Sequence, residues 1–198
     1  MTLRLLIGTA NAGKLAELRR ILAGLDLDLV SLDDLGERPA DPAEDAPSYR
    51  ENAVHKAEAY LRATGIATIA DDSGLEVDAL GGAPGVRSRR YFGEDVPAER
   101  RNAMLLGLLD GVSERGARFV CVIALARPEG GTETFDGLVQ GEIALTPSGV
   151  AGFGYDPVFV IAGDGRTMAE LPDEEKDRLS HRGLAAAKLR ARLGGEPR

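Results

Sequence analysis

Short apolar segments alternate with helical patterns at the start of this chain, and this alternation is the strongest constraint on its fold. An apolar segment at 4–8 precedes a helical pattern that begins after Asn11, and a second apolar segment follows at 27–32. Asn11 is a favourable helix N-cap, because its side chain can accept a hydrogen bond from a backbone N–H group of the first turn. Since the middle of the chain holds further apolar segments between helical patterns, we expect an α/β fold with a mixed sheet.

The remaining segments extend this sheet and place helices beside it. Ser48 and Glu51 have the spacing of a capping box, which predicts a helix start, and the polar, proline-containing segment at 33–47 is expected to be a loop. The chain has 198 residues, enough to bury a sizeable core, so one domain over 1–198 is expected. Further strands are expected at 66–70, 75–80, 118–127, 132–135, 141–145 and 158–161, and further helices at 49–62, 95–109, 173–179 and 182–193.

Composition and charge exclude several classes of function. The net charge of −8 argues against non-specific binding to a nucleic-acid backbone, so positive contacts to any anionic ligand must be concentrated locally. The chain has no run of about 18 apolar residues that would predict a membrane span, and the apolar run at 5–7 is too short for a signal peptide. The single cysteine, Cys121, lies in an apolar run and is expected to be a buried thiol. This cysteine usage suits a reducing compartment and predicts a cytoplasmic protein.

Residues 8–14 read GTANAGK, which has the spacing GxxxxGK of a phosphate-binding loop between a strand and a helix. Such a turn directs backbone N–H groups and a helix N-terminus at a phosphate, with Lys14 as a point charge. The next residue is Leu15, whereas P-loop enzymes hold Mg²⁺ through a Ser or Thr at that position. The motif therefore predicts phosphate binding but not a P-loop ATPase. A tight turn with a surface lysine is the alternative.

The acidic pair Asp71-Asp72, followed by Ser73 and Gly74, comes at the end of an apolar segment. Adjacent carboxylates repel each other unless a cation lies nearby, and Mg²⁺ prefers hard oxygen ligands while it keeps several waters. The pair could therefore hold a metal ion and polarise a metal-bound water. The alternative is a solvated turn, because Asp, Ser and Gly are favourable turn residues.

Residues 152–157 read GFGYDP and interleave two glycines with two aromatic residues. An exposed ring can stack on a nucleobase, which contributes ~1–3 kcal/mol, and glycine lets the backbone approach a base closely. The segment therefore suits a nucleotide-binding loop, with a hydrophobic plug and turn as the alternative.

Basic residues gather near the C-terminus, at Lys176 and in the run Ser180-His181-Arg182. Their donors could face phosphates or the edge of a purine. The alternative is a solvated helix face.

Taken together and in this order, the motifs resemble the inosine/xanthosine triphosphate pyrophosphatase family over nearly the whole chain. The matching pieces are Thr9-Ala10-Asn11-Ala12-Gly13-Lys14, Glu51-Asn52-Ala53 with Lys56-Ala57, Ala70-Asp71-Asp72-Ser73-Gly74-Leu75, Gly81-Gly82-Ala83-Pro84-Gly85-Val86, Ser88, Arg90-Tyr91, Gly152-Phe153-Gly154-Tyr155-Asp156-Pro157, and Lys176 before Ser180-His181-Arg182.

The resemblance implies a mixed β-sheet flanked by helices, two lobes with a central nucleotide-binding cleft, and a homodimer. It also implies Mg²⁺-dependent hydrolysis of noncanonical purine nucleoside triphosphates (ITP, dITP and XTP) between the α- and β-phosphates, which yields the nucleoside monophosphate and pyrophosphate.

Individual roles follow from the same resemblance. Asp72 matches the proton acceptor and a metal ligand, and Asp71 beside it is expected to raise its basicity. Glu44 falls where a second metal carboxylate is expected, with the other acids of 33–45 as alternatives. Substrate contacts are implied for Thr9, Ala10, Asn11, Ala12, Gly13, Lys14, Ser73, Lys176, His181 and Arg182, and base contacts for Phe153, Gly154, Tyr155 and Asp156, while Lys56 is expected to neutralise phosphates together with Lys14 and Lys176.

Three other functions are compatible with parts of the pattern: a P-loop kinase or ATPase, a septum-associated pyrophosphatase of related fold, and a catalytically silent nucleotide-binding regulator. Leu15 argues against the first, and Phe153 and His181 argue against the second. For the base, donors on His181 and Arg182 predict a preference for a 6-oxo purine over adenine. Nothing in the sequence identifies what excludes guanine.

Overall fold

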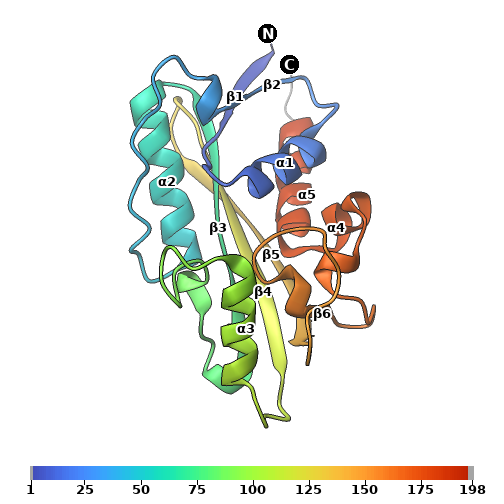
Figure 1. The fold of residues 1–198 in the computed structure, drawn as a ribbon. Coiled ribbons are helices and arrows are strands. Elements are labelled where there is room, and N and C mark those ends of the chain that lie inside the picture. The colour runs from blue at the N-terminus through green and yellow to red at the C-terminus, as the bar shows by residue number, and fades with distance from the viewer. Residues whose placement is uncertain (1, 196–198) are drawn as a thin grey trace.

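The computed structural model describes residues 2–195, which form a six-stranded mixed sheet with helices on both faces (Figure 1). The strands lie in the order β2-β1-β3-β4-β5-β6, with β1 parallel to β2 and β3 and the remaining pairs antiparallel. The strands are β1 (Leu3–Ile7), β2 (Leu27–Ser31), β3 (Ala67–Val77), β4 (Gly116–Ala126), β5 (Thr132–Ile143) and β6 (Phe159–Ile161). The helices are α1 (Ala12–Leu22), α2 (Tyr49–Thr64), α3 (Ala98–Leu108), α4 (Asp173–Leu179) and α5 (His181–Gly194). The predicted α/β class with a mixed sheet is confirmed.

β3 runs without interruption through 71–74, where the local residues predict a turn between two strands. β4 pairs with each of these residues, for example Val122 opposite Asp72, so the ladder satisfies backbone groups that a turn would leave to water. Gly74 is needed at its place, because a Cβ there would clash with the carbonyl oxygen of Gly85. The solvated-turn interpretation is therefore wrong.

β5 likewise merges the two strands predicted at 132–135 and 141–145 into one. The long β4 lies opposite it over its whole central part. A Cβ on Gly137 of β5 would clash with the carbonyl oxygen of His181. This glycine therefore lets the first turn of α5 lie directly on the sheet.

β1 ends before β3 does, and this difference in length creates an open edge. The parallel pairing of the two strands ends at Ile7 opposite Ile69, and the chain then turns away at Gly8, whose N–H donates to the Ile69 carbonyl oxygen at 2.7 Å. Residues 70–75 of β3 have no strand partner on this side within the described chain. Open α/β sheets bind ligands beside the carboxyl ends of such strands.

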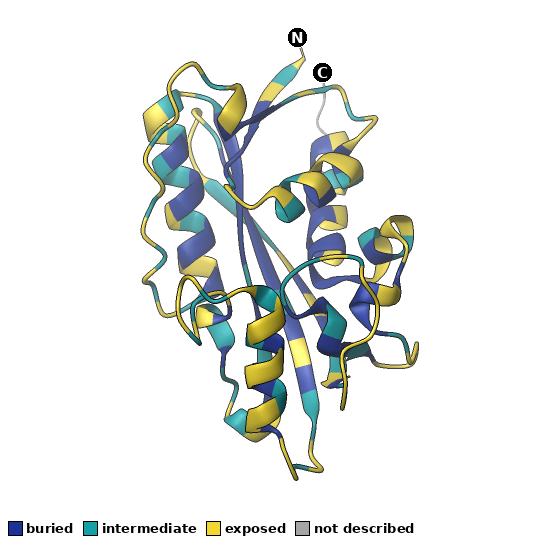
Figure 2. Ribbon diagram, in the orientation of Figure 1, coloured by how far each residue is buried: buried dark blue, intermediate teal, exposed yellow. Residues whose placement is uncertain are grey.

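Side chains alternate between the two faces of the long strands, and different helices cover these faces. α2 packs on Ala70 and Val122, whereas α1 and α5 pack on Ile69 and Cys121 of the opposite face. Figure 2 shows the buried parts of the strands between these helices. Cys121 is a buried thiol, as predicted.

A separate core lies at the other end of the long strands. It gathers Leu75 of β3, Phe119 of β4 and Leu105 of α3. No helix within residues 2–195 is both long enough and apolar enough to cross a membrane.

Candidate active site

A cavity of about 460 Å³ opens at the unpaired edge of β3, a volume within the range of small-molecule sites. Of the residues predicted to form the site, those that line the cavity are Thr9, Ala10, Asn11, Lys14, Glu44, Lys56, Asp72, Ser73, Phe153, Gly154, Tyr155, Asp156, His181 and Arg182. Ala12, Gly13 and Lys176 do not line it. The motifs at 9–14, 72–73, 153–156 and 181–182 thus meet in one place, although they are distant in sequence.

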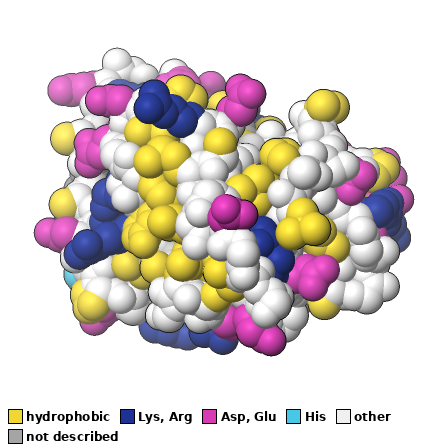
Figure 3. Space-filling view, turned by 60° about the horizontal axis from the view of Figure 1, so that its bottom comes forward, with side chains coloured by type: hydrophobic (Ala, Val, Ile, Leu, Met, Phe, Trp, Pro, Cys, Tyr) yellow, Lys and Arg dark blue, Asp and Glu magenta, His cyan; other side chains and the backbone are white. Residues whose placement is uncertain are grey.

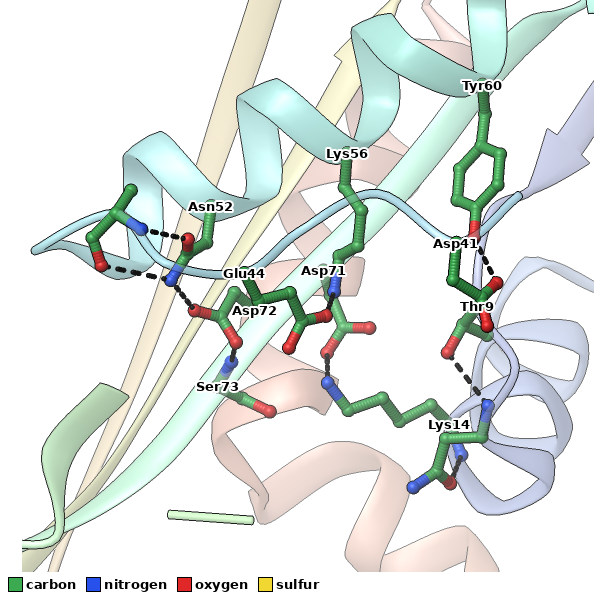
Figure 4. A network of polar contacts seen from close by, with 12 residues as sticks. Thr9, Lys14, Asp41, Glu44, Asn52, Lys56, Tyr60, Asp71, Asp72 and Ser73 are labelled. Atoms are coloured by element: carbon green, nitrogen blue, oxygen red, sulfur yellow. Dashed lines mark hydrogen bonds and ion pairs between the residues drawn. The ribbon is translucent and has the colours of Figure 1, made fainter. Parts of the chain in front are cut away.

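The adjacent carboxylates of Asp71 and Asp72 lie on opposite faces of β3, because neighbouring strand residues alternate. On the α1/α5 face, Asp71 Oδ2 lies 3.0 Å from Lys14 Nζ and 3.1 Å from Arg182 Nε. On the α2 face, Asp72 Oδ2 accepts a hydrogen bond from Asn52 Nδ2 at 2.9 Å. Figure 4 shows the separate partners of the two acids. Each carboxylate therefore has its own direct partners on its own face, while the charges of Lys14 and Lys56 act on both.

The pKa values of these two acids are shifted in opposite directions. Burial would raise the pKa of Asp71, but the charges of Lys14 and Arg182 outweigh burial and hold this pKa well below its usual value. Burial raises the pKa of Asp72, and nearby lysine charges offset only part of the rise. The basicity of Asp72 is therefore raised mainly by burial, with a smaller contribution from the charge of Glu44. The sequence predicts Asp71 as the cause instead. Acids whose pKa values diverge in this way are suited to different roles, here a fixed anion and a proton acceptor.

Glu44 reaches the cavity from the loop before α2, where its carboxylate pairs with Lys56 (Figure 4). Burial would raise the pKa of Glu44, but the charge and hydrogen bond of Lys56, together with the charge of Lys14, outweigh burial and lower this pKa. Arg90 also holds the loop by donating to the Glu44 carbonyl oxygen. Among the other acids of 33–45, Asp41 lines the cavity as well.

A chain of alternating charges lies buried behind the cavity. Glu17 of α1 pairs with Lys176 and with Arg182, at 2.7 Å in each case, and Lys176 also pairs with Asp156 at 2.6 Å. Lys176 and Arg182 are 2% and 1% exposed, so the solvated-helix interpretation of these residues is wrong. Glu17 is not among the residues that the motifs predict. Its signal in the sequence is a carboxylate beside buried Leu18 on the inner face of a helix.

Phe153 is half-buried and lies between the turn after β1 and the buried cations. A Cβ on Gly13 would clash with its ring. The ring centroid lies 4.8 Å from Lys176 Nζ and 5.4 Å from Arg182 Cζ, within the range of cation–π attraction. The Asp156 carboxylate accepts the Phe153 N–H at 2.8 Å, which fixes the turn. The ring thus closes one wall of the cavity.

The other aromatic residue of the same loop has a different environment. Tyr155 belongs to the core of Leu75 and Phe119, and its hydroxyl donates to the Ser88 carbonyl oxygen at 3.0 Å. The hydrophobic-plug interpretation therefore describes Tyr155 rather than Phe153. Asn102 of α3, which no motif includes, donates to the Gly154 carbonyl oxygen at 3.1 Å and holds the loop from the other side.

His181 begins α5 and stacks on Phe119, with ring centroids 4.5 Å apart and planes 9° apart. Burial, together with the charges of Arg182 and Lys176, holds the pKa of His181 well below its usual value, so the imidazole is neutral at neutral pH. Its Nδ1 atom is buried without a hydrogen-bond partner among the described residues. The Arg182 nitrogens Nε, Nη1 and Nη2, in contrast, each donate to an acceptor of the protein. Of the two groups, His181 is therefore the one that keeps a ring nitrogen without a protein partner among the described residues.

The donors beside the cavity fit a hard cation. Asp72 and Glu44 contribute carboxylates to its lining, and Oδ1 of buried Asp71 has no partner within the described chain. Mg²⁺ usually takes one or two protein carboxylates and completes its shell with waters and substrate phosphates. No group of three or more His, Cys, Asp or Glu side chains in residues 2–195 is placed to hold a metal ion. The residues therefore suit a cation that is bound together with a phosphate ligand.

The fold and the site define an α/β protein with a charged cavity at the carboxyl end of a parallel strand. The Ham1 family model matches residues 5–192. A dITP/XTP pyrophosphatase of Geobacter sulfurreducens is 49% identical over 193 residues, with 96% of each chain covered. That of Geobacillus kaustophilus is 49% identical over 187 residues, which cover 93% of this chain and 91% of the relative. The solved Ham1 protein of Staphylococcus aureus superposes with a TM-score of 0.87 at 40% identity, over 98% of this chain and all of that one. The chain belongs to the Ham1 family.

Proposed function

We propose that this protein is a nucleoside-triphosphate pyrophosphatase that hydrolyses dITP, ITP and XTP to the monophosphate and pyrophosphate, and so clears these noncanonical purine nucleotides. The observation that carries the proposal is the similarity, over nearly the full length, to dITP/XTP pyrophosphatases. The whole chain would work as one two-lobed domain, since the cavity takes its walls from elements of both ends of the sheet.

The triphosphate is proposed to bind along the turn 9–14 and the two cavity lysines. The N-terminus of α1 carries a partial positive charge that favours an anion, and Thr9, Ala10 and Asn11 before it line the cavity. Lys14 and Lys56 line the cavity, and their present partners are the carboxylates of Asp71 and Glu44. A triphosphate brings several negative charges to these ammonium groups, which then neutralise it.

Asp72 is proposed to accept the proton of the attacking water. Its pKa is raised by burial, which makes this carboxylate a better base than an exposed aspartate. The residues that would hold Mg²⁺ are Asp72 and Glu44, and the ion would spread the negative charge of the phosphate oxygens. Pyrophosphate leaves from the side of Lys14 and Lys56, whose charges stabilise it.

The base is proposed to lie against Phe153 and beside His181. The half-buried ring offers a surface for stacking. A neutral imidazole has one donor and one acceptor, so His181 can donate to the oxygen of a 6-oxo purine. In the tautomer that directs its N–H at the base, His181 has no acceptor for the amino donor that adenine presents at that position, and its own donor would be left unpaired. Arg182, which pairs with three protein acceptors, supports the base by lying over Phe153 rather than by reading its edge.

We further propose a cytoplasmic homodimer. Figure 3 shows apolar side chains gathered in a band on one face, among mixed acidic and basic groups. Large exposed apolar side chains include Met104, Leu108 and Val150. Light scattering coupled to gel filtration tests this, and a monomer at micromolar concentration would contradict the dimer.

The reaction is tested by identifying the products of ITP with ³¹P NMR, with and without MgCl₂. The proposal predicts IMP and pyrophosphate only when Mg²⁺ is present. Formation of IDP and orthophosphate would indicate cleavage of the terminal bond and would contradict it. No turnover of any nucleotide, with binding retained, would instead support a silent nucleotide-binding regulator.

A further inference from the structure

Asn52 lies buried on the inner face of α2 and contacts both acidic parts of the site. Its exposure is 1%, and it stands four residues before Lys56, so the two side chains share one helix face. Asn52 Nδ2 donates to Asp72 Oδ2 at 2.9 Å, while Lys56 pairs with Glu44. Figure 4 shows α2 presenting these two side chains to the two acids.

The same amide also holds the loop that carries Glu44. Asn52 Oδ1 accepts the Ala46 N–H at 3.0 Å, and Nδ2 lies 3.4 Å from the Ala46 carbonyl oxygen. Ala46 is only two residues beyond Glu44, so the hydrogen bonds of the Asn52 side chain fix the backbone next to that acid. One side chain therefore ties β3 to the loop before α2.

Both oxygens of Asp72 are held by donors of the protein. Oδ1 accepts the Ser73 N–H at 2.9 Å, and Oδ2 accepts the Asn52 amide at 2.9 Å. A carboxylate oxygen can accept more than one hydrogen bond, so each keeps capacity for water or a cation. With two donors in place the carboxylate has a defined rotation, and without Asn52 it would keep only its bond to the neighbouring N–H.

We infer that Asn52 is a positioning residue, which sets the rotation of the Asp72 carboxylate and the place of the Glu44 loop for the reaction. This inference rests on the proposed function. Residues that orient ligating or reacting groups typically change metal affinity or activity by ~10–100-fold when they are substituted. The effect should fall on kcat and on metal affinity more than on KM, because Asn52 is not among the residues that line the cavity.

Two substitutions separate this role from simple support of the loop. Asn52→Ala removes all the amide contacts, whereas Asn52→Asp keeps an acceptor for the Ala46 N–H but loses the donor and places a second carboxylate against Asp72. The inference predicts a ~10–100-fold loss of kcat for Asn52→Ala and at least as large a loss for Asn52→Asp, because like charges repel. A role confined to the loop would make Asn52→Ala the less active of the two variants, because only Asn52→Asp keeps an acceptor for the Ala46 N–H. His55→Ala, at an exposed position of the same helix, is the control and should keep wild-type kcat.

A spectroscopic measurement gives a second readout. Mn²⁺ in place of Mg²⁺ is titrated by electron paramagnetic resonance in the presence of a non-hydrolysable α,β-methylene analogue of ITP. Asn52→Ala should weaken Mn²⁺ binding ~10-fold or more, while circular dichroism shows an unchanged fold. In an Asp72→Asn background the same substitution should lower kcat by a smaller factor than in the wild type, because the part of its effect that acts through Asp72 is already lost.

Two results would overturn the inference in different ways. If the wild type releases pyrophosphate from ITP and folded Asn52→Ala matches it in kcat and Mn²⁺ affinity, only the role of Asn52 fails. If the wild type releases no pyrophosphate, the proposed function fails, and the role of Asn52 fails with it.

Discussion

Glu17→Gln is expected to destabilise the protein strongly, although the change is nearly isosteric. The Glu17 side chain is 5% exposed and pairs with Lys176 and Arg182 at 2.7 Å each. Removing one partner of a buried ion pair costs ~3–5 kcal/mol, because it leaves a buried charge without compensation. Here each cation keeps a second carboxylate, Lys176 with Asp156 at 2.6 Å and Arg182 with Asp71 at 3.1 Å. The loss should therefore lie near ~3 kcal/mol, the lower end of that range.

The loss of stability in Glu17→Gln is measured as the decrease in melting temperature, by circular dichroism, and as the decrease in the free energy of unfolding, by urea titration. For a chain of this size 1 kcal/mol corresponds to roughly 2–4 °C, so Glu17→Gln should melt roughly 6–12 °C lower. Glu174→Gln, at an exposed position of α4, is the control and should stay within ~0.5 kcal/mol of wild type. If Glu17→Gln also stays within that margin, the buried charges do not support the fold as the structure implies.

Three further outcomes are expected. Asp72→Asn should lower kcat by ~10²–10⁴-fold with little change in melting temperature, and near wild-type turnover would remove Asp72 from the role of base. Phe153→Ala should raise KM for ITP roughly 5- to 150-fold, the equivalent of ~1–3 kcal/mol of stacking; a large loss of stability at unchanged KM would show that the ring fills the core instead. Burial lowers the pKa of His181 below 6.5, so the folded state binds fewer protons than the unfolded chain. The free energy of unfolding therefore falls as the pH drops below about 6.5, and this one group lowers it by at most ~1.4 kcal/mol per pH unit. The free energy of unfolding, measured with urea between pH 5 and 7, should rise less steeply with pH for His181→Gln than for wild type or for the exposed His55→Gln. Equal pH dependence in the three proteins would contradict the assignment.

Local sequence patterns were sufficient to predict the turn between β1 and α1, where the site begins. Asn11 is the N-cap of α1, and its Oδ1 accepts the Lys14 N–H at 3.1 Å, as its position in the sequence predicts. The capping by Ser48 likewise begins α2. These features depend on residues within one helical turn, so the sequence contains all the information they need.

Features that depend on partners distant in sequence could not be predicted from local patterns. The residues 71–74 favour a turn locally, and only the ladder with β4 keeps them in a strand. Their position in a strand also sends Asp71 and Asp72 to opposite faces, which no motif predicts. The bond from Arg182 to Glu17 joins residues 165 positions apart, so the buried charge chain becomes visible only when α1, α4 and α5 are brought together.

The central claim is that the cavity selects triphosphates of 6-oxo purines that lack a 2-amino group and cleaves them to monophosphate and pyrophosphate. A comparison of kcat/KM for dITP, ITP, XTP, GTP and ATP in the presence of Mg²⁺ tests it most directly. Sites that pair with a substrate group reject analogues that lack it by as much as ~10⁴–10⁵-fold. The account predicts pyrophosphate release from dITP, ITP and XTP with kcat/KM far above that for ATP, and rejection of GTP for a reason that its 2-amino group must supply. Comparable kcat/KM values for ATP and ITP would contradict the claim.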